Sequence, residues 1–254
     1  MISSRCKRKM ARGEAVFTAK ACFQDPELVE LMASAGLDGI WICLEHKRIS
    51  PDTLHGLIQA CRLGGADAII RLKPSSYTDV ISVLESGASG VMIPRVLDPD
   101  EVRNCVNMIK FPPQGKRGCD AIHPDSAFGR AKPAEYFAHS NRETMLVVQI
   151  EEQEVVPHLE EIASIPNVDV LFIGPGDLSL GLGKFGSIDS PEVFAVIREV
   201  GAVCRRHGKV AGIPCAAEQV EKYRALGYSF FNVFSDYRGV MAGLNQALAT
   251  ACKQ

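Results

Sequence analysis

The chain has 254 residues, of which 46% are hydrophobic and 23% charged, and its formal net charge is -2. This composition is typical of a globular protein and excludes a disordered or fibrous chain. The chain has no overall positive field, so we expect no nucleic-acid and no membrane partner and favour a small-molecule ligand.

The first twelve residues carry the one basic cluster of the sequence, and no apolar segment follows it as it would in a secretory signal. The cluster consists of Arg5, Lys7, Arg8, Lys9 and Arg12. We therefore predict a solvated, disordered tail over residues 1–12 and a single folded domain over residues 13–254.

Eight short apolar runs alternate with amphipathic helical segments along this domain, the pattern of a parallel sheet covered by helices. Most of the runs are apolar on both faces, as buried parallel strands are. The predicted strands span 15–18, 39–44, 68–72, 90–94, 145–150, 168–174, 210–214 and 230–234.

The segments between these runs have recognisable helix ends. Asp25 and Pro26 precede one helical segment and Gly36 follows it, while Asp98 and Pro99 begin another. Strand and helix alternate without a gap, and the length matches the roughly 250 residues of a (β/α)₈ barrel. We predict a single (β/α)₈ TIM barrel; the competing doubly wound sheet lacks a GxGxxG fingerprint after its first strand.

Two segments are longer than the connections that a minimal barrel requires. Residues 110–142 are rich in Pro and Gly with little periodicity, and residues 174–191 follow the sixth predicted strand. Long connections of this kind are usually functional, so we interpret both as loops that help to build a site.

The nine cysteines are scattered singly through the chain and show no zinc-binding spacing. This use of cysteine indicates a reduced, cytoplasmic setting. No apolar stretch reaches the roughly 18 residues that span a membrane.

Polar residues follow four of the predicted strands, where a barrel places its active site. They are Glu45 and His46 after the second strand, Arg71 at the third, Gln149 and Glu151 at the fifth, and the segment 174–177 after the sixth.

Glu151 and Asp177 are carboxylates on adjacent strand ends with no Cys or His pair beside them. Such a donor set suits a hard divalent cation such as Mg²⁺ or Mn²⁺, which retains water and substrate oxygens. Taken singly, Asp177 also fits a helix N-cap, and Glu151 also fits a first helical turn.

Arg71 and His46 are the candidate catalytic side chains. A guanidinium at the barrel mouth can bind a carboxylate or stabilise an enolate oxygen, and a histidine can transfer a proton. A structural ion pair for Arg71 and a structural role for His46 are the alternatives. Gly174 and Gly176 would let backbone N–H groups approach an anion closely.

These segments, in this order and spacing, resemble the HpcH/HpaI aldolase family over nearly the whole chain. The resemblance is carried by the segments 41–46 (WICLEH), 91–95 (VMIPR), 115–118 (GKRG), 147–151 (VVQIE) and 172–179 (FIGPGDLS), together with Arg71.

The resemblance implies a barrel of the phosphoenolpyruvate/pyruvate-binding type and a class II aldolase that cleaves 4-hydroxy-2-oxo acids to a 2-oxo acid and an aldehyde. By resemblance, Glu151 and Asp177 match the ligands of Mg²⁺, Mn²⁺ or Co²⁺, and Arg71 matches the arginine that steadies the enolate. His46 matches the catalytic histidine, and Gln149, Gly176 and Asp177 lie on the substrate side. The resemblance also implies a homo-oligomer, a hexamer or another dimer-based assembly, in which the last helix, 237–251, is exchanged.

The sequence departs from the family at two places. Cys43 stands where the family has an Asp that orients the histidine, and residues 119–125 replace small residues after the GKRG turn. Two other readings therefore stay open: a lyase of the same superfamily acting on an acyl-CoA ester or another 2-oxo acid, and a non-catalytic 2-oxo acid binder.

Overall fold

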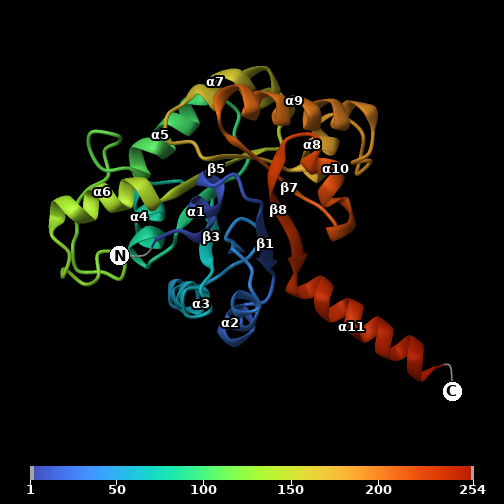
Figure 1. The fold of residues 1–254 in the computed structure, drawn as a ribbon, viewed down its shortest axis with the longest axis horizontal. Coiled ribbons are helices and arrows are strands. Elements are labelled where there is room, and N and C mark those ends of the chain that lie inside the picture. Colours follow the sequence, from blue (N-terminus) through green and yellow to red (C-terminus); the bar gives the residue numbers. More distant parts are fainter. Residues whose placement is uncertain (1–2, 253–254) are drawn as a thin grey trace.

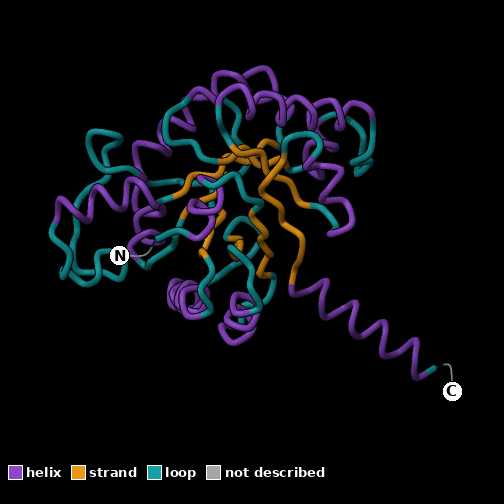
Figure 2. The backbone as a smooth tube through the Cα atoms, viewed as in Figure 1, coloured by secondary structure: helices purple, strands orange, loops and turns teal. Residues whose placement is uncertain are grey.

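The computed structural model describes residues 3–252 and forms a closed barrel of eight parallel strands in sequential order, which confirms the predicted fold class. The strands lie in the centre and the helices outside them (Figures 1 and 2). The strands are β1 Val16–Ala21, β2 Gly39–Cys43, β3 Asp67–Arg71, β4 Gly90–Ile93, β5 Met145–Ile150, β6 Val170–Ile173, β7 Val210–Pro214 and β8 Tyr228–Ser235.

Side chains alternate between the barrel interior and the layer of helices because successive residues of a strand face opposite ways. The interior holds its own apolar cluster, which includes Val16, Trp41, Ile69, Val147 and Phe172. This cluster fills the barrel below its C-terminal mouth, so the polar residues that follow it along the strands lie at the mouth.

The helices begin where short polar caps satisfy their first N–H groups. Asp25, Ser50, Ser76, Asp98 and Ser190 each accept a hydrogen bond from the first turn of the following helix. The long helices after these caps are α2 Pro26–Ser34, α3 Pro51–Leu63, α4 Tyr77–Glu85, α5 Pro99–Ile109 and α9 Pro191–His207, and the shorter α7 Leu159–Ser164 and α10 Val220–Arg224 complete the outer layer.

The N-terminal segment is ordered, so the prediction of a disordered tail over residues 1–12 is wrong for the described residues. Helix α1, Arg5–Ala11, packs on the N-terminal end of the barrel, where Cys6 is fully buried. Asp67 accepts the backbone N–H groups of Arg5 and Cys6, and Lys9 pairs with Asp38 at 2.7 Å. The basic cluster is ordered because carboxylates at the strand starts neutralise it. Residues 1 and 2 of the predicted tail lie outside the described residues.

Both long segments expected to be loops contain a helix. Helix α6, Pro133–Glu143, ends the first segment, and helix α8, Pro175–Gly181, begins the second. Helix α6 was missed because few of its residues are apolar; its buried Tyr136 instead donates a hydrogen bond to Asp125 of the preceding loop. The irregular part of the first segment is therefore limited to residues 110–132.

The C-terminal helix α11, Asp236–Ala251, extends away from the barrel, to the lower right in Figure 1. Its bounds agree with the predicted 237–251. Asp236 is its single buried residue, and its large apolar side chains are exposed. They are Tyr237, Val240, Met241, Leu244 and Leu248.

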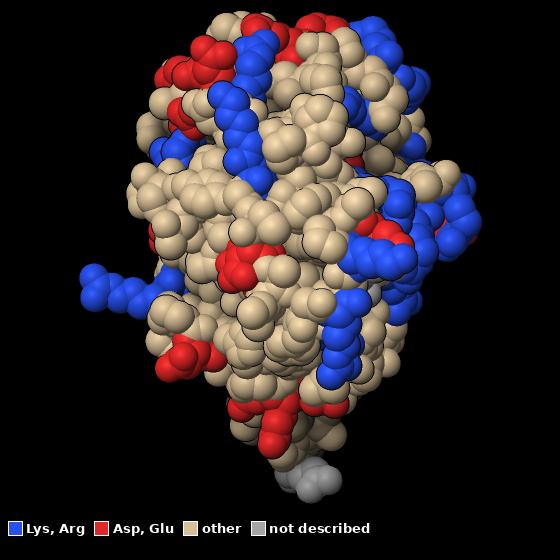
Figure 3. All heavy atoms as spheres, turned by 90° about the vertical axis from the view of Figure 1, so that its left-hand side faces the viewer, with Lys and Arg blue, Asp and Glu red and all other residues tan. Residues whose placement is uncertain are grey.

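The surface of the α4 and α6 side carries positive and negative side chains interspersed among uncharged ones (Figure 3). Such mixing leaves no extended single-sign patch on this face. Within residues 3–252, no helix combines the length and the apolar character that a bilayer crossing requires.

Candidate active site at the mouth of the barrel

Arg71 lies at the C-terminal end of β3 and is 3% exposed. Its guanidinium donates from Nη1 to Oε1 of Gln149 at 3.3 Å and from Nη2 to Sγ of Cys43 at 3.0 Å. Its carbon Cζ lies 4.7 Å from the ring centroid of Trp41, within the range of a cation–π contact. Arg71 is therefore held on three sides at the mouth.

Gln149 connects this arginine to Glu151. Its amide nitrogen donates a hydrogen bond to Oε2 of Glu151, while its amide oxygen accepts from Arg71. Glu151, directly after β5, is 1% exposed, and its Oε1 accepts the backbone N–H of Arg95 at 2.8 Å. A buried row of three polar side chains thus crosses from β3 to β5.

The pKa of Glu151 is raised to about 7, mainly by burial and also by the negative charges of Asp177 and Glu45, against the lowering effects of the Arg95 N–H and the charge of Arg71. A carboxylate in this environment is costly to ionise without a compensating cation.

Asp177 lies in the first turn of α8, half-buried. Gly174 precedes this helix, and a Cβ there would come within 2.6 Å of Oε2 of Glu151. The backbone between β6 and α8 therefore approaches Glu151 as closely as only a glycine permits. Gly176 is exposed, and a Cβ on it would meet nothing within 4 Å, so a ligand can reach its backbone.

His46 lies at the rim of the barrel mouth and is not part of the buried row of Arg71, Gln149 and Glu151. Its side chain is 58% exposed, and its Nε2 is 3.7 Å from Oε2 of Glu45. Cys43 accepts the backbone N–H of His46 at 3.4 Å, so the thiol holds the main chain of this segment. The structure thus links Arg71 and Glu151 through Gln149 and places His46 outside this row.

Three buried polar atoms on the β2 and β3 side of the mouth make no hydrogen bond within residues 3–252. They are Nε1 of Trp41, Oε2 of Glu45 and Nε of Arg71, and the last two lie 3.3 Å apart as an ion pair. Glu45 and Arg71 thus satisfy each other electrostatically, and Nε1 of Trp41 remains a buried donor without a polar partner among the described residues.

Three residues at this site were not assigned a role from the sequence: Trp41, Glu45 and Arg95. Trp41 is the one tryptophan of the chain and lies within a predicted strand, so its inward direction could have been read from the alternation. Glu45 was noted as a strand end without a role. The contact of Arg95 is made by its backbone, in a left-handed conformation with φ of 53°, and no side-chain pattern signals it.

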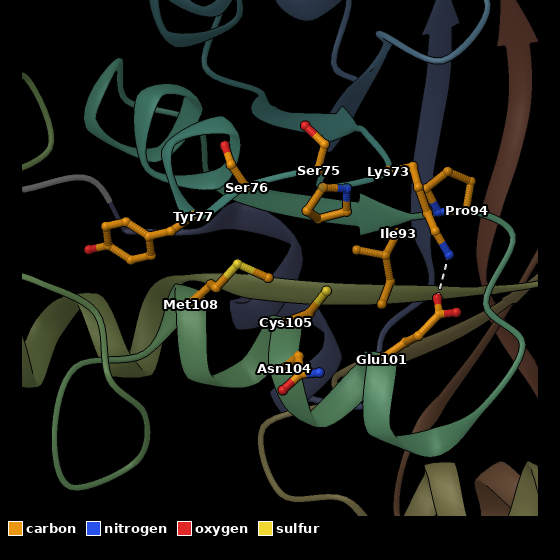
Figure 4. A pocket seen from close by; sticks show the side chains of 11 residues that line it. Lys73, Ser75, Ser76, Tyr77, Ile93, Pro94, Glu101, Asn104, Cys105 and Met108 are labelled. Carbon is orange, nitrogen blue, oxygen red and sulfur yellow. Dashed lines mark hydrogen bonds and ion pairs between the residues drawn. The ribbon is translucent and has the colours of Figure 1, made fainter.

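A separate pocket of about 380 Å³ lies beside the mouth, between α4 and α5 (Figure 4). Ile93, Cys105 and Met108 contribute apolar side chains to it. Its one lysine, Lys73, is paired with Glu101 and donates to the carbonyl oxygen of Arg95. The pocket's lining includes none of the predicted site residues.

The sequence profile of the HpcH/HpaI aldolase/citrate lyase family matches residues 21–241. The chain is 34% identical, over 86% of each sequence, to a 2-dehydro-3,6-dideoxy-6-sulfogluconate aldolase of Pseudomonas putida. It is 32% identical to a hydroxypyruvate/pyruvate aldolase of Pseudomonas aeruginosa, over 96% of this chain and 91% of the relative.

A solved structure gives the same result for the fold. A HpcH/HpaI aldolase/citrate lyase family protein from Burkholderia cenocepacia J2315 superposes with a TM-score of 0.90. The two sequences are 26% identical, and the match covers 98% of this chain and 99% of the other.

Proposed function

Because the chain belongs to the HpcH/HpaI aldolase/citrate lyase family, we propose that it is a metal-dependent aldolase that cleaves or forms 4-hydroxy-2-oxo acids. The observation that carries the proposal is the buried row of Arg71, Gln149 and Glu151 at the mouth, with Asp177 in the first turn of α8 after the neighbouring strand β6. The two curated relatives named above are both aldolases, which supports the same reaction class.

Glu151 and Asp177 fit a divalent cation by their chemistry. The raised pKa of Glu151, caused chiefly by burial, supports a role for an added cation beside this carboxylate. Within the described part of the chain, no group of three or more His, Cys, Asp and Glu side chains could hold a metal. Two carboxylates suit Mg²⁺ or Mn²⁺, which fill their other positions with water and substrate oxygens. When bound, such an ion supplies Lewis-acid polarisation of the 2-oxo group.

Arg71 is placed to stabilise the negative charge that develops on the 2-oxo oxygen when the bond between C3 and C4 breaks. Its contacts with Cys43, Gln149 and Trp41 fix the plane of the guanidinium before the substrate arrives. Preorganised charge of this kind is commonly the largest contribution to catalysis. Gln149 supports both Arg71 and Glu151, so it couples the two halves of the site.

We assign the proton transfer at the 4-hydroxyl to His46, acting directly or through a water. Cleavage of the C3–C4 bond leaves its electron pair in the enolate, and the 4-hydroxyl proton passes to the base as the aldehyde forms. The enolate then takes a proton at C3 to give the 2-oxo acid. The exposed ring of His46 lies beside Glu45, which supplies a nearby negative charge.

The contact of Cys43 with Arg71 favours a catalyst over a non-catalytic binder. The thiol sulfur is a hydrogen-bond acceptor for the guanidinium, so the replacement of the family Asp does not leave Arg71 without a partner at this point. The enolate-stabilising half of the site therefore keeps its support.

We further propose that α11 docks on a second copy of the chain. Tyr237, Val240, Leu244 and Leu248 follow one another at helical spacing, and all are exposed. A single helix held mainly at its start would be marginally stable in water, whereas packing against a partner barrel buries this row. Docking of α11 on a second copy would give a dimer-based homo-oligomer.

Pyruvate release from a 4-hydroxy-2-oxo acid, measured in chelator-treated buffer and after addition of Mn²⁺, tests the proposed reaction. We expect activity only with the metal, and Asp177→Asn should weaken Mn²⁺ binding at least tenfold while the melting temperature stays close to that of the wild type. Full activity of the wild type or of Asp177→Asn in chelator-treated buffer without added metal would refute the proposed metal site.

A further inference from the structure

Lys20 lies in the barrel mouth, although it was not a predicted site residue. The predicted first strand ended at residue 18, whereas β1 continues to Ala21 and so includes Lys20. Two residues earlier, Thr18 is buried, and the alternation of the strand gives Lys20 the same inward direction. In register, Lys20 is opposite Trp41, and its Nζ lies 5.0 Å from the centroid of that ring.

Lys20 and Arg71 occupy the same level of the barrel. Alternate strands of a (β/α)₈ barrel contribute side chains to one interior layer, and these two residues come from β1 and β3 on either side of Trp41 in β2. Both cations contact the ring of that tryptophan. Gln149 of β5 belongs to the same set of alternate strands, so Lys20 shares the layer that carries the proposed chemistry.

Three cations at or beside the mouth are paired with carboxylates. Arg71 lies 3.3 Å from Glu45, Arg95 lies 2.6 Å from Glu152, and Lys73 pairs with Glu101. Lys20 differs: across residues 3–252, no carboxylate lies within ion-pair distance of its ammonium group, which contacts the ring of Trp41 and acts through its charge on the thiol of Cys22. An inward-facing, half-buried ammonium group without an ion-pair partner is available to an anion that enters the mouth.

The position of Lys20 indicates which part of a ligand it would meet. In the closed order of strands, β1 lies across the barrel from β5, which leads to Glu151. A substrate whose 2-oxo acid end lies at Glu151 and Asp177 would extend its other end across the mouth, toward β1. That end is the half that departs as the aldehyde.

We propose that Lys20 is a specificity-determining residue that binds a carboxylate, or a similarly compact anion, on the aldehyde half of the substrate. This inference rests on the proposed aldolase function. It narrows the substrate class to 4-hydroxy-2-oxo acids whose distal end is negatively charged.

The test compares two aldehydes of equal chain length in aldol addition to pyruvate with Mn²⁺, the anionic succinic semialdehyde and the neutral butanal. Lys20→Met removes the charge and Lys20→Arg keeps it, while Lys116→Met is a matched charge change on an exposed residue of the 110–132 loop. A hydrogen bond to a charged group corresponds to a change of roughly 10- to 100-fold. We therefore expect kcat/KM of Lys20→Met to fall by roughly that factor with succinic semialdehyde and to stay constant with butanal, and Lys20→Arg to retain most of the activity.

Equal losses with both aldehydes, or no loss with either, would overturn the role of Lys20 while leaving the aldolase function standing. If the wild type uses neither aldehyde, binding decides the question for Lys20, and the proposed function fails only if the pyruvate-release assay is also negative. Calorimetric titration with succinate should then show at least tenfold weaker binding to Lys20→Met than to the wild type and Lys116→Met. Equal succinate affinity would overturn the proposal.

Discussion

The thiol sulfur of Cys43 accepts a hydrogen bond from Nη2 of Arg71 at 3.0 Å, linking the ends of β2 and β3. The same sulfur accepts the backbone N–H of His46. Cys43 therefore acts on the guanidinium and on the main chain of the histidine segment, whereas the family comparison suggested an effect on the histidine ring. We therefore expect Cys43 to act in the site by positioning Arg71.

Cys43→Ala should lower kcat/KM by about tenfold, because the loss of one hydrogen bond to a charged group corresponds to ~1.5 kcal/mol. Cys43→Ser keeps an acceptor at nearly the same place and should retain more activity. Steady-state kinetics of the two variants, with melting curves to verify folding, test this order. An alanine variant as active as the wild type would contradict the positioning role.

Arg71→Lys should lower kcat by about 100-fold, or about 3 kcal/mol, with a small change in KM. A lysine ammonium cannot reach Cys43 and Gln149 at once while lying on Trp41, so the charge would no longer be fixed at the enolate oxygen. A rise in KM alone, with kcat preserved, would indicate that Arg71 contributes only to binding.

The raised pKa of Glu151 predicts a pH-dependent stability of the metal-free protein. Because the folded-state pKa, about 7, lies above the ordinary value of 4.5, the proton binds the folded state more tightly. The resulting stabilisation is fully present below pH 4.5 and is lost as the pH rises through 7, a difference of about 3 kcal/mol. Glu151→Gln should remove this part of the pH dependence when unfolding is measured between pH 5 and 8 in chelator. Parallel curves for the two proteins would contradict it.

Gly174→Ala should weaken Mn²⁺ binding and destabilise the fold by about 1–3 kcal/mol, because the added Cβ collides with Glu151. Gly176→Ala, two residues later, meets no atom within 4 Å and should keep both Mn²⁺ affinity and melting temperature. Its KM for the 2-oxo acid should rise, because the methyl group covers backbone that we assign to substrate. Equal effects of Gly174→Ala and Gly176→Ala on Mn²⁺ affinity and melting temperature would contradict these separate roles of the two glycines.

Leu244→Glu should dissociate the proposed oligomer, because it places a charge within the exposed apolar row of α11. Gln246→Glu adds the same charge two residues along the helix, away from the row, and should leave the assembly intact. Sedimentation velocity of both variants and the wild type provides the measurement. A monomeric wild type would rule out the assembly.

Much of the fold could be predicted because its signals are local. The apolar runs located all eight strands, with β5 and β7 matching to the residue, since burial on both faces requires consecutive apolar side chains. The order of strands then placed Arg71, Gln149, Glu151 and Asp177 at one end of the barrel, as parallel strands with polar ends require. Membership of the family and the residue types of the site were accessible at this level.

The remaining features depend on contacts between distant parts of the chain. From the sequence alone, the basic N-terminal segment is predicted to be a solvated tail. In the structure, Asp38 and Asp67 at the starts of two strands bind this segment. The link between Cys43 and Arg71 and the position of Lys20 over Trp41 exist only once the strands pair in their observed register. Local periodicity determines which residues form strands, whereas closure of the barrel determines which strand-end side chains meet, and that closure is a property of the folded chain as a whole.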